Sequence, residues 1–176
     1  MQRQFGAEID WLPYELHPEY PVEGISRETL RARFGDDWED RLRSLFAHNG
    51  FAYNPPLETV PSTRLALEVG EQARAEGLTD AYHRRLMGAY WQEARDLGDE
   101  AVVRELALEV GVSSAGLDDA ISTRAFGRVL DATRVSAVGV GIDGIPAFLL
   151  DRSLLVVGAH PHATFERAFE QLRAGA

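Results

Sequence analysis

Hydrophobic positions in the middle of the chain recur at intervals of three and four residues, and this spacing predicts amphipathic helices. Ser26, Thr79 and Asp99 are predicted to cap the helices that they precede, and Gly50, Gly77 and Gly111 stand where helices end. The pattern predicts helices at 26–34, 36–49, 62–76, from 79, at 99–110 and from 123, with a short helical turn around 117–121. About six helices therefore occupy the central part of the chain.

The spacing changes near both ends of the chain. Residues 7–12 alternate, with Ile9 and Trp11 on one face, which predicts a short strand. Two apolar runs, 147–150 and 154–157, flank Asp151-Arg-Ser and predict a hairpin, and a C-terminal helix follows with Pro161 in its first turn. Residues 2–5 precede Gly6 and are predicted to form the last turn of a helix.

The order of strand, helices, hairpin and helix indicates an α/β protein in which a helical insertion interrupts a sheet domain. We expect residues 1–23 and 139–176 to form the sheet domain and residues 24–138 to form the helical domain. The strand at 7–12 has no obvious neighbour in such a small sheet, because parallel strands are joined by crossover units and none precedes it.

Composition narrows the range of functions. The chain has 176 residues, of which 45% are apolar, so it can bury a sizeable core. Its formal net charge of -10 argues against binding to nucleic acid, which requires clustered positive charge. No apolar run is long enough for a membrane span and no secretory signal is apparent, so we expect no membrane partner and a cytoplasmic location.

Two residue types are missing, and their absence limits the chemistry further. All 18 basic residues are arginine, which excludes a lysine Schiff base or a lysine general base. The chain also contains no cysteine, which excludes disulfides, cysteine-ligated metals and thiol exchange by its own side chains. Acidic clusters such as Asp36-Asp37 are interpreted as helix N-terminal charges, and we expect no metal site.

Four segments in a fixed order resemble one family. They are Trp11-Leu-Pro-Tyr-Glu-Leu-His-Pro with Pro21-Val-Glu-Gly24, Val60-Pro-Ser-Thr-Arg-Leu-Ala66, Gly144-Ile-Pro-Ala-Phe148 and Gly158-Ala-His-Pro161. The chain resembles the DsbA-like thioredoxin superfamily, in particular its FrnE-like branch, which is related to 2-hydroxychromene-2-carboxylate isomerases and kappa-class glutathione transferases. The resemblance implies a thioredoxin-like fold with a large inserted all-helical domain and the activity of a thiol-disulfide oxidoreductase.

The same resemblance identifies what the sequence does not contain. The family pattern opens with a strand, a Cys-Pro-X-Cys motif and a long first helix, and here the first strand and most of the first helix are absent. Three interpretations follow. A longer protein supplies the strand and the motif; or the chain is a redox-inactive relative that binds a peptide or a partner; or it is a relative of the glutathione-dependent isomerases and transferases. As given, the chain has no catalytic residue for disulfide exchange.

The resemblance also implies substrate-binding residues. Gly144, Ile145 and Pro146 correspond to the cis-proline loop, whose backbone pairs with an extended substrate in the family. Trp11 and Tyr14 correspond to the end of a strand near the active-site edge, although core packing is an alternative explanation for Trp11.

Three further residues complete the predicted site. Thr63 and Arg64 resemble an Asn-Thr-Arg segment near the family site, and a helix end and a surface charge are the alternative interpretations. His160 stands near the start of the last helix, where a capping or surface role is the alternative. The implied partners are a peptide or a thiol/disulfide substrate, with glutathione as a further ligand. A second copy of the chain is another implied partner, which would complete the sheet in a homodimer.

Overall fold

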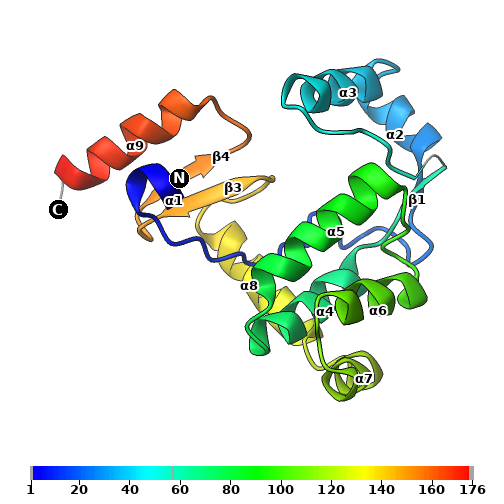
Figure 1. Cartoon of the computed structure of the whole chain (residues 1–176). Coiled ribbons are helices and arrows are strands. Elements are labelled where there is room, and N and C mark those ends of the chain that lie inside the picture. Colours follow the sequence, from blue (N-terminus) through cyan, green and yellow to red (C-terminus); the bar gives the residue numbers. More distant parts are fainter. Residues whose placement is uncertain (1, 57, 175–176) are drawn as a thin grey trace. The chain divides into compact units, whose positions relative to one another are not determined.

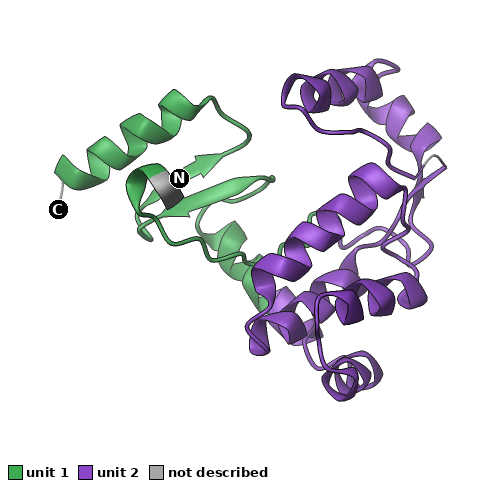
Figure 2. Ribbon diagram, in the orientation of Figure 1, with its two compact units in different colours: residues 1–16, 132–176 green, residues 17–131 purple. Residues whose placement is uncertain are grey.

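The computed structural model describes residues 2–56 and 58–174, and its backbone divides into two compact units. One unit comprises residues 1–16 and 132–176, and the other comprises residues 17–131 (Figure 2). The expected domains, 1–23 with 139–176 and 24–138, have a similar discontinuous arrangement with different bounds. No helix in the described part of the chain is long and apolar enough to cross a membrane.

The unit 17–131 is built mainly from helices (Figure 1). Its elements are β1 (Ile25–Ser26), α2 (Arg27–Phe34), α3 (Trp38–His48), β2 (Thr59–Val60), α4 (Arg64–Ala75), α5 (Thr79–Glu93), α6 (Glu100–Glu109), α7 (Ser114–Thr123) and the start of α8 (Gly127–Gly139). The helix α4 packs against α5, α6 and α7. Apolar side chains from these four helices form the core, and Val69, Val103 and Leu106 are fully buried in it.

Local sequence explains where several of these helices begin. The side chain of Ser26 accepts a hydrogen bond from the amide of Thr29 at the start of α2, and that of Asp99 accepts one from Ala101 at the start of α6. Both predicted caps are confirmed. Thr79, which was expected to cap a helix, is instead the first residue of α5, because Leu78 occupies the cap position.

A short antiparallel bridge between β1 and β2 was not predicted from the sequence. Ile25 lies opposite Val60 and Ser26 opposite Thr59. Gly24 precedes the bridge with φ +82°, and a Cβ atom there would lie 2.5 Å from the carbonyl oxygen of Val60. Only glycine fits this approach of two backbones, so Gly24 allows the bridge between β1 and β2 to form.

The other unit contains α1 (Gln2–Phe5), the end of α8, β3 (Ala147–Leu150), β4 (Leu154–Val157) and α9 (His162–Ala174). The predicted hairpin is confirmed: β3 and β4 are antiparallel, with Ala147 opposite Val157. Aromatic contacts pack its helices, since Phe148 meets Phe165 edge to face at 4.9 Å and Phe5 stacks on Phe169 at 4.4 Å.

Two expectations about elements are wrong. Residues 7–12 form no strand in the described structure, and Ile9 and Trp11 are 40% and 39% exposed. A strand requires a neighbour for its backbone groups, and the alternating pattern supplies none. In α3, the helical spacing of Trp38, Leu42, Leu45 and Phe46 predicts an inward face, but Leu45 is 51% exposed and none of the residues of α3 is fully buried.

Candidate functional site

The predicted cis-proline loop, Gly144–Pro146, lies in the segment 140–146 that connects α8 to β3 (Figure 1). The end of α8 positions the start of the loop. Gly141 has φ +90°, its amide bonds to the carbonyl of Val138 at 3.0 Å, and the amide of Ile142 bonds to the carbonyl of Ala137 at 2.9 Å. This pair of bonds is the Schellman arrangement, which requires a left-handed residue and so favours glycine at position 141.

The other end of the loop is held by the hairpin. The amide of Gly158, just after β4, donates a hydrogen bond of 2.7 Å to the carbonyl of Pro146. The Ile145–Pro146 peptide bond is cis. From Ala147 onward the chain enters the ladder with β4, so the loop is fixed at its C-terminal end by backbone hydrogen bonds alone.

Tyr14 reaches the loop from the N-terminal segment of the same unit. Its hydroxyl donates a hydrogen bond of 3.3 Å to the carbonyl of Ile142. The phenol is half-buried, and this contact joins two segments 128 residues apart in the sequence. Tyr14 therefore supports the loop, which is compatible with the predicted place of this residue at the site.

Ile145 is an exposed residue of the loop. The residue is 54% exposed although it is apolar. Neither the amide nor the carbonyl of Ile145 makes a hydrogen bond within residues 2–56 and 58–174. Asp143 and Gly144 likewise make no backbone hydrogen bond in the described part of the chain, so a short stretch of backbone held at both ends is left open to an extended ligand, with Ile145 next to the proline.

His160 lies next to the strand that borders the loop. Its Nε2 atom lies 2.9 Å from the carbonyl oxygen of Val157, and the imidazole is exposed. This contact connects the residue to the end of β4, directly before Gly158. The structure thus brings His160, Tyr14 and the loop residues Gly144–Pro146 into one unit, together with Trp11, whose indole is 39% exposed.

Thr63 and Arg64 belong to the other unit, at the start of α4. Thr63 occupies the cap position and is exposed, and in the described structure its side chain makes no capping bond. Arg64 takes part in an ion-pair network: its Nη2 atom lies 2.9 Å from Asp131, and its Nε atom lies 3.4 Å from the buried carboxylate of Glu68. These contacts give Arg64 a structural role in the helical unit.

The open backbone of the loop offers hydrogen bonds to a ligand. The chain has no thiol, and the part that the structure describes holds no cluster of three histidine or acidic side chains suited to a metal ion. Sequence reasoning missed Ile142 and Val157, which act through their carbonyl groups, because no side-chain pattern marks a backbone contact. It also missed an arginine-lined cavity in the unit 17–131, which is described below.

Known proteins similar to this chain identify its family. The family described as DSBA-like thioredoxin domain matches residues 1–170. The "Uncharacterized protein YwbO" of Bacillus subtilis (strain 168) is 27% identical over 169 residues, covering 92% of this chain and 80% of that protein.

A solved structure shows the same fold. The "probable DsbA oxidoreductase SCO1869 from Streptomyces coelicolor" superposes with a TM-score of 0.83 at 24% identity, covering 92% of this chain and 74% of that chain. The predicted α/β, thioredoxin-like fold is thereby confirmed. With the family match over nearly the whole sequence, the chain belongs to the family of DSBA-like thioredoxin domains.

Proposed function

We propose that the chain is a protein of the thiol-disulfide oxidoreductase type that holds an extended polypeptide at the loop 144–146 and does not itself exchange disulfides. The open backbone of Ile145, fixed between α8 and β3, is the observation that carries this proposal. Family membership supports the oxidoreductase assignment, and the solved relative with a DsbA fold is described as a probable oxidoreductase.

Binding would resemble the addition of a short strand. The amide and the carbonyl of Ile145 would each pair with the backbone of the ligand, as at an open sheet edge. Backbone pairing gives affinity with little dependence on the sequence of the ligand. Exchange requires an attacking thiolate, and the 176 residues contain none.

Hydrogen exchange of the complex tests the binding step. The probe is insulin B chain whose cysteines have been blocked by alkylation, so that no disulfide chemistry takes part. We expect the amide of Ile145 to exchange more slowly when the peptide is present, while the hairpin turn at 151–153 is unchanged. Equal exchange of the loop with and without peptide would refute the proposal.

A pair of variants separates the loop from other apolar surface. Ile145→Asp places a charge at the open residue and is expected to weaken binding of the same peptide by about tenfold, which corresponds to 1.4 kcal/mol. Val135→Asp changes a residue of α8 that is 71% exposed and should leave the affinity unchanged. Fluorescence anisotropy of a labelled peptide measures both, and equal losses in the two variants would contradict binding at the loop.

Glutathione is the further ligand implied for this site. It is an extended tripeptide, so the same hydrogen-exchange experiment with glutathione in place of the peptide tests whether it occupies the loop. If glutathione slows exchange at Ile145 and the peptide does not, a glutathione-dependent function is favoured over polypeptide binding.

A further inference from the structure

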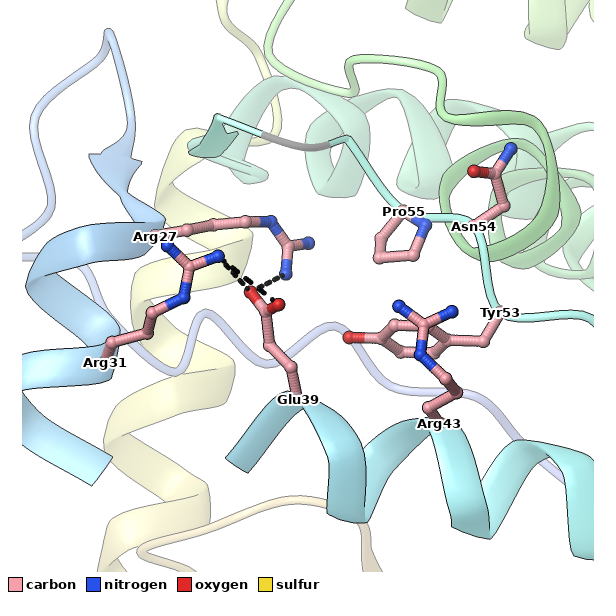
Figure 3. Close-up of a pocket in the computed structure, with 7 residues that line it drawn as sticks. All are labelled: Arg27, Arg31, Glu39, Arg43, Tyr53, Asn54 and Pro55. Carbon is pink, nitrogen blue, oxygen red and sulfur yellow. Dashed lines mark hydrogen bonds and ion pairs between the residues drawn. The ribbon is translucent and has the colours of Figure 1, made fainter. Parts of the chain in front are cut away.

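A cavity of about 240 Å³ opens in the unit 17–131, between α2, α3 and the segment that follows α3 (Figure 3). Arg27 and Arg31 line it from α2, Glu39 and Arg43 from α3, and Tyr53 from the following segment. A water molecule occupies about 30 Å³ in the liquid, so the cavity has room for roughly eight waters or a small organic ion. None of these residues belongs to the loop 144–146.

Arg27 forms the buried wall of the cavity. The residue is only 4% exposed, and its guanidinium donates to the carbonyl of Pro56 and, at 3.1 Å, to Glu39. Burial has the largest single effect on the pKa of Arg27 and lowers it, but the hydrogen bond to Glu39 and the interactions with Tyr90 and Tyr53 together raise the pKa above its ordinary value. A positive charge is therefore held permanently inside the unit.

The charges around the cavity do not cancel. Glu39 is the one carboxylate among the lining residues, and it is shared: Arg27 lies 3.1 Å and Arg31 lies 3.3 Å from its Oε1 atom. Arg43 makes no ion pair in the described part of the chain, and its guanidinium lies over the ring of Tyr53 at 4.9 Å. Three guanidinium groups facing one carboxylate leave an excess of two positive charges in a chain whose formal net charge is -10.

Tyr53 supplies an unused donor. Its hydroxyl oxygen is buried and donates to no acceptor among the residues that the structure describes, while it lies near enough to the guanidinium of Arg27 to raise the pKa of that group. Figure 3 shows this hydroxyl directed toward the space between Arg27 and Glu39. Buried polar groups nearly always find a partner, so an unpaired hydroxyl beside an excess of positive charge indicates a missing acceptor.

We propose that this cavity binds the oxyanion group of a small molecule, a phosphate or a carboxylate. The hydroxyl of Tyr53 donates to one oxygen, Arg43 and Arg31 supply charge-assisted hydrogen bonds to the others, and Arg27 provides the buried positive charge behind them. Guanidinium groups suit this ligand because their planar arrangement of donors matches oxyanions. The site is independent of peptide binding at the loop 144–146.

Thermal unfolding in the presence of simple anions tests the site with the whole chain. The probes are inorganic phosphate and sodium acetate at millimolar concentration, with sodium chloride at matched ionic strength as the reference. An anion that binds only the folded chain raises the unfolding midpoint in a saturable manner. We expect such a rise with at least one of the two probes, and the stronger probe identifies the oxyanion as phosphate or carboxylate.

Variants connect the effect to the cavity. Arg43→Gln removes a charged donor and is expected to weaken the apparent affinity for the active probe by about tenfold, which corresponds to 1.4 kcal/mol. Tyr53→Phe retains the ring under Arg43 but removes the hydroxyl donor, and it should also weaken the apparent affinity for the probe. Arg33→Gln removes an exposed arginine of α2 outside the cavity lining and should leave the affinity unchanged.

Two results would overturn the proposal. One is a midpoint that responds to phosphate and acetate no more than to chloride at the same ionic strength, which requires no variant to observe. The other is an equal response in the native chain, in Arg43→Gln and in Tyr53→Phe, because a general salt effect would not depend on these side chains.

Discussion

Glu68 illustrates at the residue scale how the helical unit tolerates a buried charge. Its carboxylate is almost fully buried, and two nitrogens of Arg124 lie 2.8 and 2.9 Å from its two oxygens. Arg64 lies 3.4 Å away on the same helix. A buried carboxylate is tolerated only when it is paired, so the arginines that surround it are part of the fold.

Removing one of these partners should destabilise the chain. We expect Arg124→Gln to lower the free energy of unfolding by about 1–3 kcal/mol, because Glu68 keeps only its longer contact to Arg64. Arg128→Gln, an exposed arginine of α8, is the control and should change stability by less than about 0.5 kcal/mol. Urea titration followed by circular dichroism measures both, and equal effects of the two changes would argue against a structural role for the pair.

The sequence predicts the roles of residues whose contacts are local and not of residues whose partners are distant along the chain. Ser26 and Asp99 were identifiable as caps because capping acts over two or three residues in one direction along the chain. The partners of Glu68 lie 4 and 56 residues away, so no local pattern marks the longer pairing. The same holds for Tyr14, whose acceptor is a carbonyl group 128 residues away.

At the scale of elements, a carboxylate joins the end of one helix to the start of another. Glu76 follows α4, and its oxygens accept hydrogen bonds of 2.8 Å from both the amide and the hydroxyl of Ser113, the cap of α7. Gln72 donates to the same carboxylate at 2.6 Å. The backbone bond from Ser113 lowers the pKa of Glu76, and the side-chain bonds from Gln72 and Ser113 lower it further.

This link should make the stability of the helical unit depend on pH. A carboxyl group whose pKa is lower in the folded than in the unfolded chain stabilises the fold above its ordinary pKa of 4.5, and this contribution disappears as the pH falls through the lowered value. We expect the unfolding midpoint of Glu76→Gln to fall less steeply between pH 5 and pH 3. The difference should be roughly the contribution of one titrating carboxyl group. Glu170→Gln, an exposed residue of α9, serves as the control, and identical profiles for both variants would contradict the assignment.

Most helices and the hairpin were predictable, while the elements that depend on partners were not. The repeats that predict α4 and α6 arise from their buried faces, where Val69 and Val103 lie. The alternation at Ile9 and Trp11 has the period of a strand, but no backbone pairs with it in the described structure. The bridge between β1 and β2 involves two residues on each side, which is too short for a period to be visible.

At the scale of the whole molecule, the division into two units can be tested by expression of fragments. The core lies between Ala66 and Ile121, within the unit 17–131. We expect a fragment of residues 17–139, which retains all of α8, to be helical and to unfold cooperatively on heating. Circular dichroism measures both properties, and a gradual melt would show that the unit depends on the rest of the chain.

A second fragment locates the boundary more precisely. The sequence favoured a helical domain of residues 24–138, which lacks the segment in which His17 stacks on Tyr20 at 4.3 Å. If that segment belongs to the helical unit, the fragment 24–138 should unfold at a lower temperature than 17–139. Equal midpoints would favour the bounds expected from the sequence.

The complete lack of cysteine leads to a prediction for the entire chain. In an insulin precipitation assay with dithiothreitol, the time course with the chain present should equal that of buffer, because no side chain can form a mixed disulfide. Added thioredoxin is the positive control. A rate above that of buffer would contradict the proposed lack of exchange.

The close approach at Gly24 has a consequence for tracing the ancestry of the arginine cavity. A side chain at this position would collide with the carbonyl of Val60 and separate β1 from β2. Because β1 leads directly into Arg27, such a change would also displace the buried wall of the cavity. Relatives that inherited the cavity should therefore retain glycine three residues before the arginine, and this pair of positions offers a simple marker for finding them in sequence collections.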